Sequence, residues 1–136
     1  MNGESPSGPV KKILVVDDDE IILKTLSLKL QGAGYQALTA LDGAEAVAAA
    51  RNENPDLILL DIGFPPAVDG VQWDGFRVMD WFHRLDEQKK IPIIIITGSE
   101  DPKIKERALC SKAAAFFHKP IDHDDLLMVI RSVLGG

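Results

Sequence analysis

The chain has 136 residues, of which 46% are hydrophobic, so it can form one domain with a single core. Its longest aliphatic stretch is far too short to cross a bilayer. A net charge of −6 argues against a broad nucleic-acid-binding surface, and the single cysteine, Cys110, excludes an internal disulfide and a thiolate metal cluster. A free cysteine usually behaves as a small buried residue, so we expect the Cys110 side chain to be buried on a helix.

The first ten residues differ in composition from the rest of the chain. Residues 1–10 are rich in Gly, Ser and Pro and lack the apolar core of a signal peptide, so we expect a flexible leader on a cytoplasmic protein. From residue 11 onward, short aliphatic runs alternate with segments of helical periodicity, and no linker interrupts them. We therefore expect one domain over residues 11–136.

This domain begins with a strand. Residues 13–16 form a continuous aliphatic run, which is typical of a strand covered on both faces. Residues 20–30 carry apolar side chains at helical spacing, and we expect Gly32 and Gly34 to end that helix. A second strand is expected over residues 35–40.

The middle of the chain repeats this strand–helix pattern. Asp42 is a suitable N-cap for an alanine-rich helix that we expect to run to about residue 52. A third strand over residues 57–60 and a helix over residues 75–85 follow, again with apolar residues placed to face a core.

The last third of the chain adds two strands and two helices. Residues 93–96 are four isoleucines, which suits a fully covered central strand. Pro102, a favoured first helical residue, predicts a helix to about residue 112. A fifth strand is expected over residues 114–118, and Asp122 is placed to cap a last helix that runs through residue 134.

Five strands alternating with five helices predict an α/β fold with a doubly wound parallel sheet. In such a sheet, ligands bind at the carboxyl ends of the strands. The residues at four of these ends are acids, a hydroxyl and an ammonium group: Asp17, Asp18, Asp19, Asp61, Thr97 and Lys119. We expect these groups to converge on one edge of the sheet.

Carboxylates gathered this closely need a cation, because like charges disfavour each other's ionised form. Oxygen ligands without nearby His or Cys favour a hard cation, and the intracellular candidate is Mg²⁺, for which Mn²⁺ can substitute. We expect Asp17, Asp18 and Asp61 to hold it. Asp61 can then attack a phosphoryl group as nucleophile, while Lys119 pairs with Asp61 at rest and with phosphate afterwards, and Thr97 donates its hydroxyl.

Each of these residues alone has an ordinary structural explanation. A strand-terminal Asp often caps the next helix, which is the interpretation that we favour for Asp19. Thr97 alone would be a common strand residue, Lys119 a solvated charge and Asp61 a turn residue. Their shared location at four strand ends makes coincidence a poor explanation.

The chain resembles the response-regulator receiver domains of two-component systems over about residues 11–134. The resemblance lies in Val15-Val16-Asp17-Asp18, in residues 57–61 and 93–97, and in Phe117-His118-Lys119-Pro120. It implies a flavodoxin-like fold with strand order 2-1-3-4-5. It also implies a signalling switch that catalyses only its own phosphorylation and dephosphorylation, rather than an enzyme.

By that resemblance, Asp61 is the phosphorylation site and receives its phosphoryl group from a histidine kinase or a histidine phosphotransfer protein. Asp17 and Asp18 are the metal carboxylates, and Gly63 offers a backbone carbonyl to the Mg²⁺. The peptide bond between Lys119 and Pro120 is usually cis in this family.

Thr97 and Phe116 match the two switch positions of the family. The resemblance implies that phosphorylation draws Thr97 toward the phosphate, lets Phe116 turn inward and changes the face made by helix four, strand five and helix five. It further implies a downstream protein target and a monomer or a phosphorylation-dependent homodimer, with no direct contact with nucleic acid or membrane.

The sequence departs from the family pattern after the third strand. Asp69-Gly70 is followed by a second Asp74-Gly75, so we expect a lengthened loop over residues 66–73 beside the site. We expect Trp73 in this loop to pack on the surface; the alternatives are that it covers the acidic pocket or meets a partner. Lys112 also stands where the family commonly has Gly.

Three alternatives remain open at this point. A haloacid-dehalogenase-type phosphatase would use Asp17-x-Asp19, but the small residue and Thr that should follow are Glu20-Ile21 here. A flavodoxin-like cofactor binder needs a Gly- and hydroxyl-rich loop after strand one, where an acidic triplet would repel phosphate. A degenerate receiver would bind a protein partner without phosphorylation.

Overall fold

The structure is a computed structural model that describes residues 10–62, 79, 80, 84, 91–98, 100, 102–111 and 113–135. Each of its helices and strands falls on a segment that the sequence predicts. In chain order they are β1 (Lys12–Val16), α1 (Glu20–Gly32), β2 (Gln36–Ala40), α2 (Gly43–Glu53), β3 (Leu57–Asp61), β4 (Ile93–Thr97), α4 (Pro102–Leu109), β5 (Ala115–His118) and α5 (His123–Leu134).

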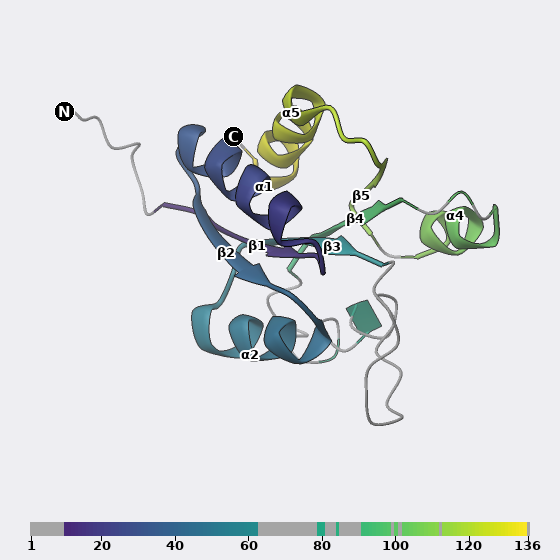
Figure 1. Ribbon diagram of the computed structural model, residues 1–136, viewed down its shortest axis with the longest axis horizontal. Coiled ribbons are helices and arrows are strands. Elements are labelled where there is room, and N and C mark those ends of the chain that lie inside the picture. The colour runs from purple at the N-terminus through teal and green to yellow at the C-terminus, as the bar shows by residue number, and fades with distance from the viewer. Residues whose placement is uncertain are drawn as a thin grey trace.

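The five strands form one parallel sheet in the order β2-β1-β3-β4-β5, as expected. Every residue of β3 and β4 is buried, which confirms the central, fully covered positions that their aliphatic sequences indicate. In Figure 1, α1 and α5 lie together on one face of the sheet and α2 lies on the other. The expected doubly wound arrangement is therefore present.

The core consists of two layers, because successive residues of a strand point to opposite faces of the sheet. We call one the α2/α4 layer; it contains Leu14, Val16, Ala46, Ala50, Ile58, Leu60, Ile93, Ile95 and Ala108, with Ile104 packed against it. The other, the α1/α5 layer, contains Ile13, Val15, Leu23, Leu26, Leu30, Leu57, Leu59, Ile94, Ile96, Leu126 and Ile130.

Aspartates cap three of the helices. Asp42 accepts a hydrogen bond from the backbone N–H of Glu45, and Asp122 accepts from those of Asp124 and Asp125. Asp19 caps α1 by accepting from the backbone N–H of Ile21, which confirms the structural role that the sequence favours for it.

The first helix ends where the sequence predicts, whereas α4 ends early. Gly32 is the last residue of α1, Ala33 is its C-cap, and Gly34 follows with a positive φ. The α4 helix ends at Leu109 instead of continuing to about residue 112. There the hydroxyl of Ser111 donates to the carbonyl of Ala108 at 2.6 Å and so competes with continued helical bonding.

Cys110 is exposed and directly follows α4, so the expectation of a buried helical cysteine is wrong. The prediction fails because α4 ends at Leu109, one residue before Cys110, and only Ala108 of this helix is buried. Among the described helices, none is both long and apolar enough to span a membrane.

The strands β1 and β3 are joined at the ends where they begin. The backbone N–H of Lys12 donates to the Asp56 carboxylate at 2.8 Å, and the Asp56 N–H donates to the Lys12 carbonyl at 2.8 Å. The ammonium group of Lys12 also donates to the carbonyl of Glu53, in the last turn of α2, at 3.1 Å. These contacts fix the register of the two strands that carry the acidic residues.

Several predicted features lie outside the described residues. These are the leader up to residue 9, Gly63, the loop over residues 66–73 with Trp73, and Lys112. Most of the helix expected over residues 75–85 also lies outside them, although Met79 and Asp80 are helical and Met79 is buried in the α2/α4 layer.

Candidate functional site

The chemistry-bearing residues gather where the strands end. Asp17 and Asp18 directly follow β1, whereas Asp61 and Thr97 are the last residues of β3 and β4. Lys119 follows β5, and its backbone N–H donates to the carbonyl of Thr97 at 2.8 Å. Because all the strands are parallel, these ends meet at one edge of the sheet, as the sequence predicts.

Three carboxylates form a cluster at this edge. One oxygen each of Asp17, Asp18 and Asp61 lies within 4.8 Å of the others. Asp17 and Asp61 are buried, with 2% and 4% of their surface exposed, while Asp18 is exposed. Such oxygen-only donors suit a hard divalent cation, and the exposed Asp18 leaves the cluster open to solvent on one side.

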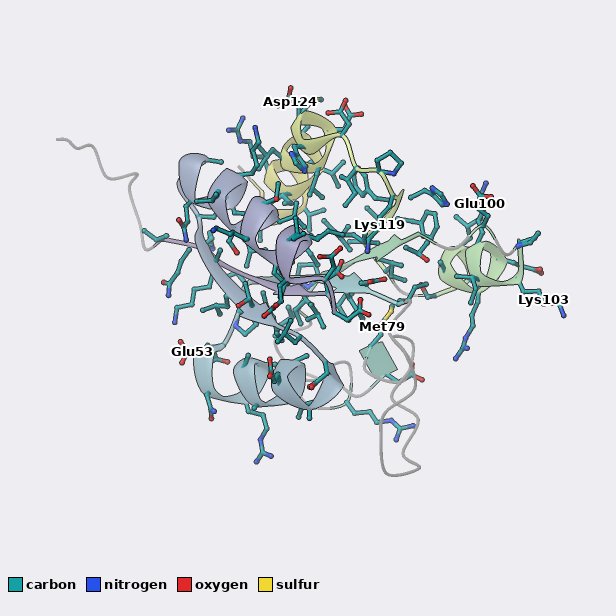
Figure 2. All side chains as sticks on the ribbon, in the orientation of Figure 1. Glu53, Met79, Glu100, Lys103, Lys119 and Asp124 are labelled. Atoms are coloured by element: carbon teal, nitrogen blue, oxygen red, sulfur yellow. The ribbon has the colours of Figure 1, made fainter. Side chains whose placement is uncertain are left out.

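Lys119 is the positive group of the cluster (Figure 2). Its ammonium nitrogen lies 2.9 Å from Oδ2 of Asp17 and 3.2 Å from Oδ2 of Asp61. The pairing with Asp61 is the one that the sequence predicts. The shorter contact with Asp17 was not predicted, and the peptide bond that follows Lys119 is cis, as the family resemblance implies.

The environment of Lys119 favours its charged form. Partial burial by itself lowers the pKa of the ammonium group. The hydrogen bond with Asp17 and the negative charges of Asp61 and Asp17 outweigh that effect, so that the pKa of Lys119 lies above its ordinary value.

This raised pKa predicts a loss of stability in alkaline solution. The ion pairs of Lys119 contribute fully below the unfolded pKa of about 10.4, and their contribution disappears as the pH rises through the higher folded pKa. With EDTA present, the free energy of unfolding should fall more steeply above about pH 10 in the wild type than in Lys119→Met.

Urea denaturation at a series of pH values measures this slope, and Lys105→Met is the matched control, because Lys105 is an exposed lysine on α4. Parallel curves for the wild type and Lys119→Met would contradict the assignment of the stabilising ion pairs to Lys119.

Thr97 and Phe116 occupy neighbouring strands. Thr97 is 1% exposed, so its side chain belongs to the interior of the site rather than to its rim. Phe116 lies opposite Ile95 in the β4–β5 register and packs, partly buried, against the α2/α4 layer. The structure thus places both predicted switch residues at the β4–β5 end of the sheet.

Gly98 is a neighbour of the site that the sequence did not predict. Gly98 follows β4, and a Cβ added to it would lie 3.6 Å from Cδ of Lys119. The backbone at Gly98 therefore lies against the stem of the lysine. The only sequence signal is a glycine directly after the fourth strand, which by itself is too common to identify a contact.

The chain is similar to known proteins in both sequence and structure. The family model of the response regulator receiver domain matches residues 13–131. The protein PilH of Pseudomonas aeruginosa is 34% identical over 125 residues, which cover 92% of this chain and 98% of PilH. The polar-differentiation response regulator DivK of Brucella anthropi is 31% identical over 92% of this chain and 97% of its own.

Solved structures agree with the sequence relatives. A CheY-like receiver domain protein from Methanospirillum hungatei superimposes with a TM-score of 0.81 and 30% identity, covering 93% of this chain and 95% of that one. The chemotaxis protein CheY4 of Vibrio cholerae gives a TM-score of 0.79 and 30% identity over 92% of this chain and 99% of its own. With its fold, its acidic cluster and these relatives, the chain belongs to the response-regulator receiver domain family.

Proposed function

We propose that this chain is a phosphoacceptor switch in which Asp61 receives a phosphoryl group from the phosphohistidine of a histidine kinase or histidine phosphotransfer protein. The observation that carries the proposal is the position of Asp61. Its carboxylate is buried at the end of β3, lies within 4.8 Å of the Asp17 and Asp18 oxygens, and has Lys119 at 3.2 Å.

Asp17, Asp18 and Asp61 would hold Mg²⁺ or Mn²⁺, together with the carbonyl of Gly63, which lies outside the described residues. When bound, the cation supplies charge neutralisation for the phosphoryl oxygens. An oxygen of Asp61 forms the new P–O bond while the P–N bond to the donor imidazole breaks, and the departing imidazole takes up a proton from solvent.

Lys119 and Thr97 would act on the phosphoryl group after transfer. Lys119 already lies beside Asp61, so its ammonium group can follow the new negative charge with little displacement. The hydroxyl of Thr97 would donate to a phosphate oxygen, and Phe116 would then turn inward. The changed packing would alter the face formed by α4, β5 and α5, which is where a downstream protein would read the signal.

The remaining parts of the proposal concern the whole protein. Residues 11–136 form the receiver domain, and the protein acts in the cytoplasm as a monomer or as a homodimer that forms on phosphorylation. It is a switch that acts on itself rather than an enzyme with an external substrate, and it contacts neither nucleic acid nor membrane directly.

Intact mass measured after incubation with acetyl phosphate tests the proposal. With Mg²⁺, the protein should gain the mass of one phosphoryl group, and with EDTA in place of Mg²⁺ the gain should be lost, because the carboxylate cluster and the donor phosphate repel each other without a cation. A phosphorylated histidine phosphotransfer protein serves as a second donor. A folded chain that gains no mass from either donor would instead be a binding module that works without phosphorylation.

A further inference from the structure

Both oxygens of the Asp17 carboxylate already have partners. Oδ1 accepts a hydrogen bond from the backbone N–H of Asp19 at 2.9 Å, and Oδ2 lies 2.9 Å from the ammonium nitrogen of Lys119. The residue is 2% exposed, so solvent does not compete for either oxygen. A cation that binds Asp17 must therefore share an oxygen or replace one of these two partners.

The contact with Asp19 is the less replaceable of the two. Asp19 is the N-cap of α1, and its backbone N–H is held in the turn that connects β1 to this helix. Withdrawing Oδ1 would leave that N–H without its acceptor, which costs free energy in a partly buried turn.

Lys119, by contrast, has a second carboxylate within reach. If its ammonium group leaves Asp17, it keeps the contact with Asp61, which is 3.2 Å away. Its backbone stays tied to the carbonyl of Thr97, so only the end of the side chain has to move. Lys119 is therefore the partner that can exchange.

Sharing Oδ2 between Lys119 and a cation is unfavourable. A divalent cation that binds Oδ2 at about 2.1 Å, while the ammonium nitrogen stays 2.9 Å from the same oxygen, would place the two positive charges roughly 3.5–5 Å apart. Two positive charges at that separation in a partly buried site repel strongly. Asp17, Asp18, Asp61 and Lys119 together carry a net charge of −2, so Mg²⁺ neutralises the cluster without requiring the loss of Lys119 from it.

We propose that Lys119 and the divalent cation compete for Oδ2 of Asp17, so that Lys119 sets the cation affinity of the resting site. This inference rests on the metal site of the proposed function and adds a regulator to it. Lys119 is the internal counter-ion of Asp17 until the cation arrives, and it then remains with Asp61 alone. The resting protein accordingly binds the cation more weakly than its three carboxylates would by themselves.

Calorimetric titration with Mg²⁺ tests the competition. Lys119→Met should bind Mg²⁺ about tenfold more tightly than the wild type, which corresponds to about 1.4 kcal/mol. Lys105→Met, which removes the same charge from an exposed position on α4, should leave the affinity unchanged. An unchanged or weaker affinity of a folded Lys119→Met, beside measurable binding to the wild type, would overturn the inference and leave the metal site intact. No binding to the wild type would overturn the metal site itself.

A double-mutant cycle separates competition for one oxygen from general repulsion between charges. If Lys119 acts through Oδ2 of Asp17, its removal should change the Mg²⁺ affinity by less than about twofold in the Asp17→Asn background. The same factor in both backgrounds would mean simple repulsion and would overturn the inference.

A measurement on the wild type avoids any variant that folds poorly. During a Mg²⁺ titration followed by NMR, the side-chain nitrogen signal of Lys119 should shift with the same dissociation constant as the carboxyl carbon signal of Asp17. A Lys119 signal that stays constant while the Asp17 signal moves would overturn the proposal.

Discussion

Replacing Asp61 with Asn is expected to abolish phosphoryl transfer to this chain. The substitution keeps the shape of the side chain and removes its charge, so the buried position at the end of β3 should remain filled. An amide has no oxygen nucleophilic enough to form the P–O bond, and it also weakens the cation cluster with Asp17 and Asp18. The intact mass after treatment with acetyl phosphate and Mg²⁺ should be that of the unmodified protein.

Asp42→Asn is the matched control for this variant. Asp42 is an exposed aspartate that caps α2, and Asn is an equally good N-cap, so the same change of charge should leave phosphorylation unaffected. Full labelling of Asp61→Asn would show that another residue is the acceptor. Equal loss of labelling in both variants would point to net charge rather than to the Asp61 carboxylate.

Ile95→Ala is expected to have the largest effect on stability. Ile95 is 0% exposed in the middle of β4, where Leu60 of β3 and Phe116 of β5 flank it. Removing its side chain from a closely packed layer should lower the free energy of unfolding by about 2–5 kcal/mol. This is a large share of the roughly 5–15 kcal/mol that stabilises an ordinary domain.

Urea denaturation of Ile95→Ala beside Ile95→Val measures this effect. The valine variant removes one methyl group from the same place and should cost about 0.5–1.5 kcal/mol. Leu28→Ala on the exposed side of α1 should cost less than either, because the Leu28 side chain is 62% exposed. If Ile95→Ala cost no more than Ile95→Val, the surroundings of β4 would have to be more open than the structure indicates.

The sequence predicts most of the fold because each of its local signals agrees with the others. The four isoleucines of β4 permit only a covered strand, and the aspartates at positions 42 and 122 mark helix starts. The end of α4 could not be predicted, because it depends on a hydrogen bond of the Ser111 hydroxyl that competes with the helix.

The candidate site, like the fold, was predictable from the sequence only in part. Strand order alone brings Asp17, Asp61 and Lys119 to one edge, so their meeting is predictable from the alternation of elements. The sequence does not predict that Asp17 is the closer partner of Lys119, because this depends on the direction of two side chains and on the turn that holds Asp19. Sequence patterns specify where a strand ends, whereas the pairing of individual oxygen atoms requires coordinates.

The two core layers separate the surfaces through which this protein can communicate. Phe116 packs against the α2/α4 layer, while its neighbour Phe117 packs against the α1/α5 layer on the opposite side of the sheet. In the proposed function, rotation of the Phe116 ring would therefore alter the packing of the α2/α4 layer rather than that of the α1/α5 layer. One side of the molecule would then stay constant as a recognition surface while the other reported the state of the site.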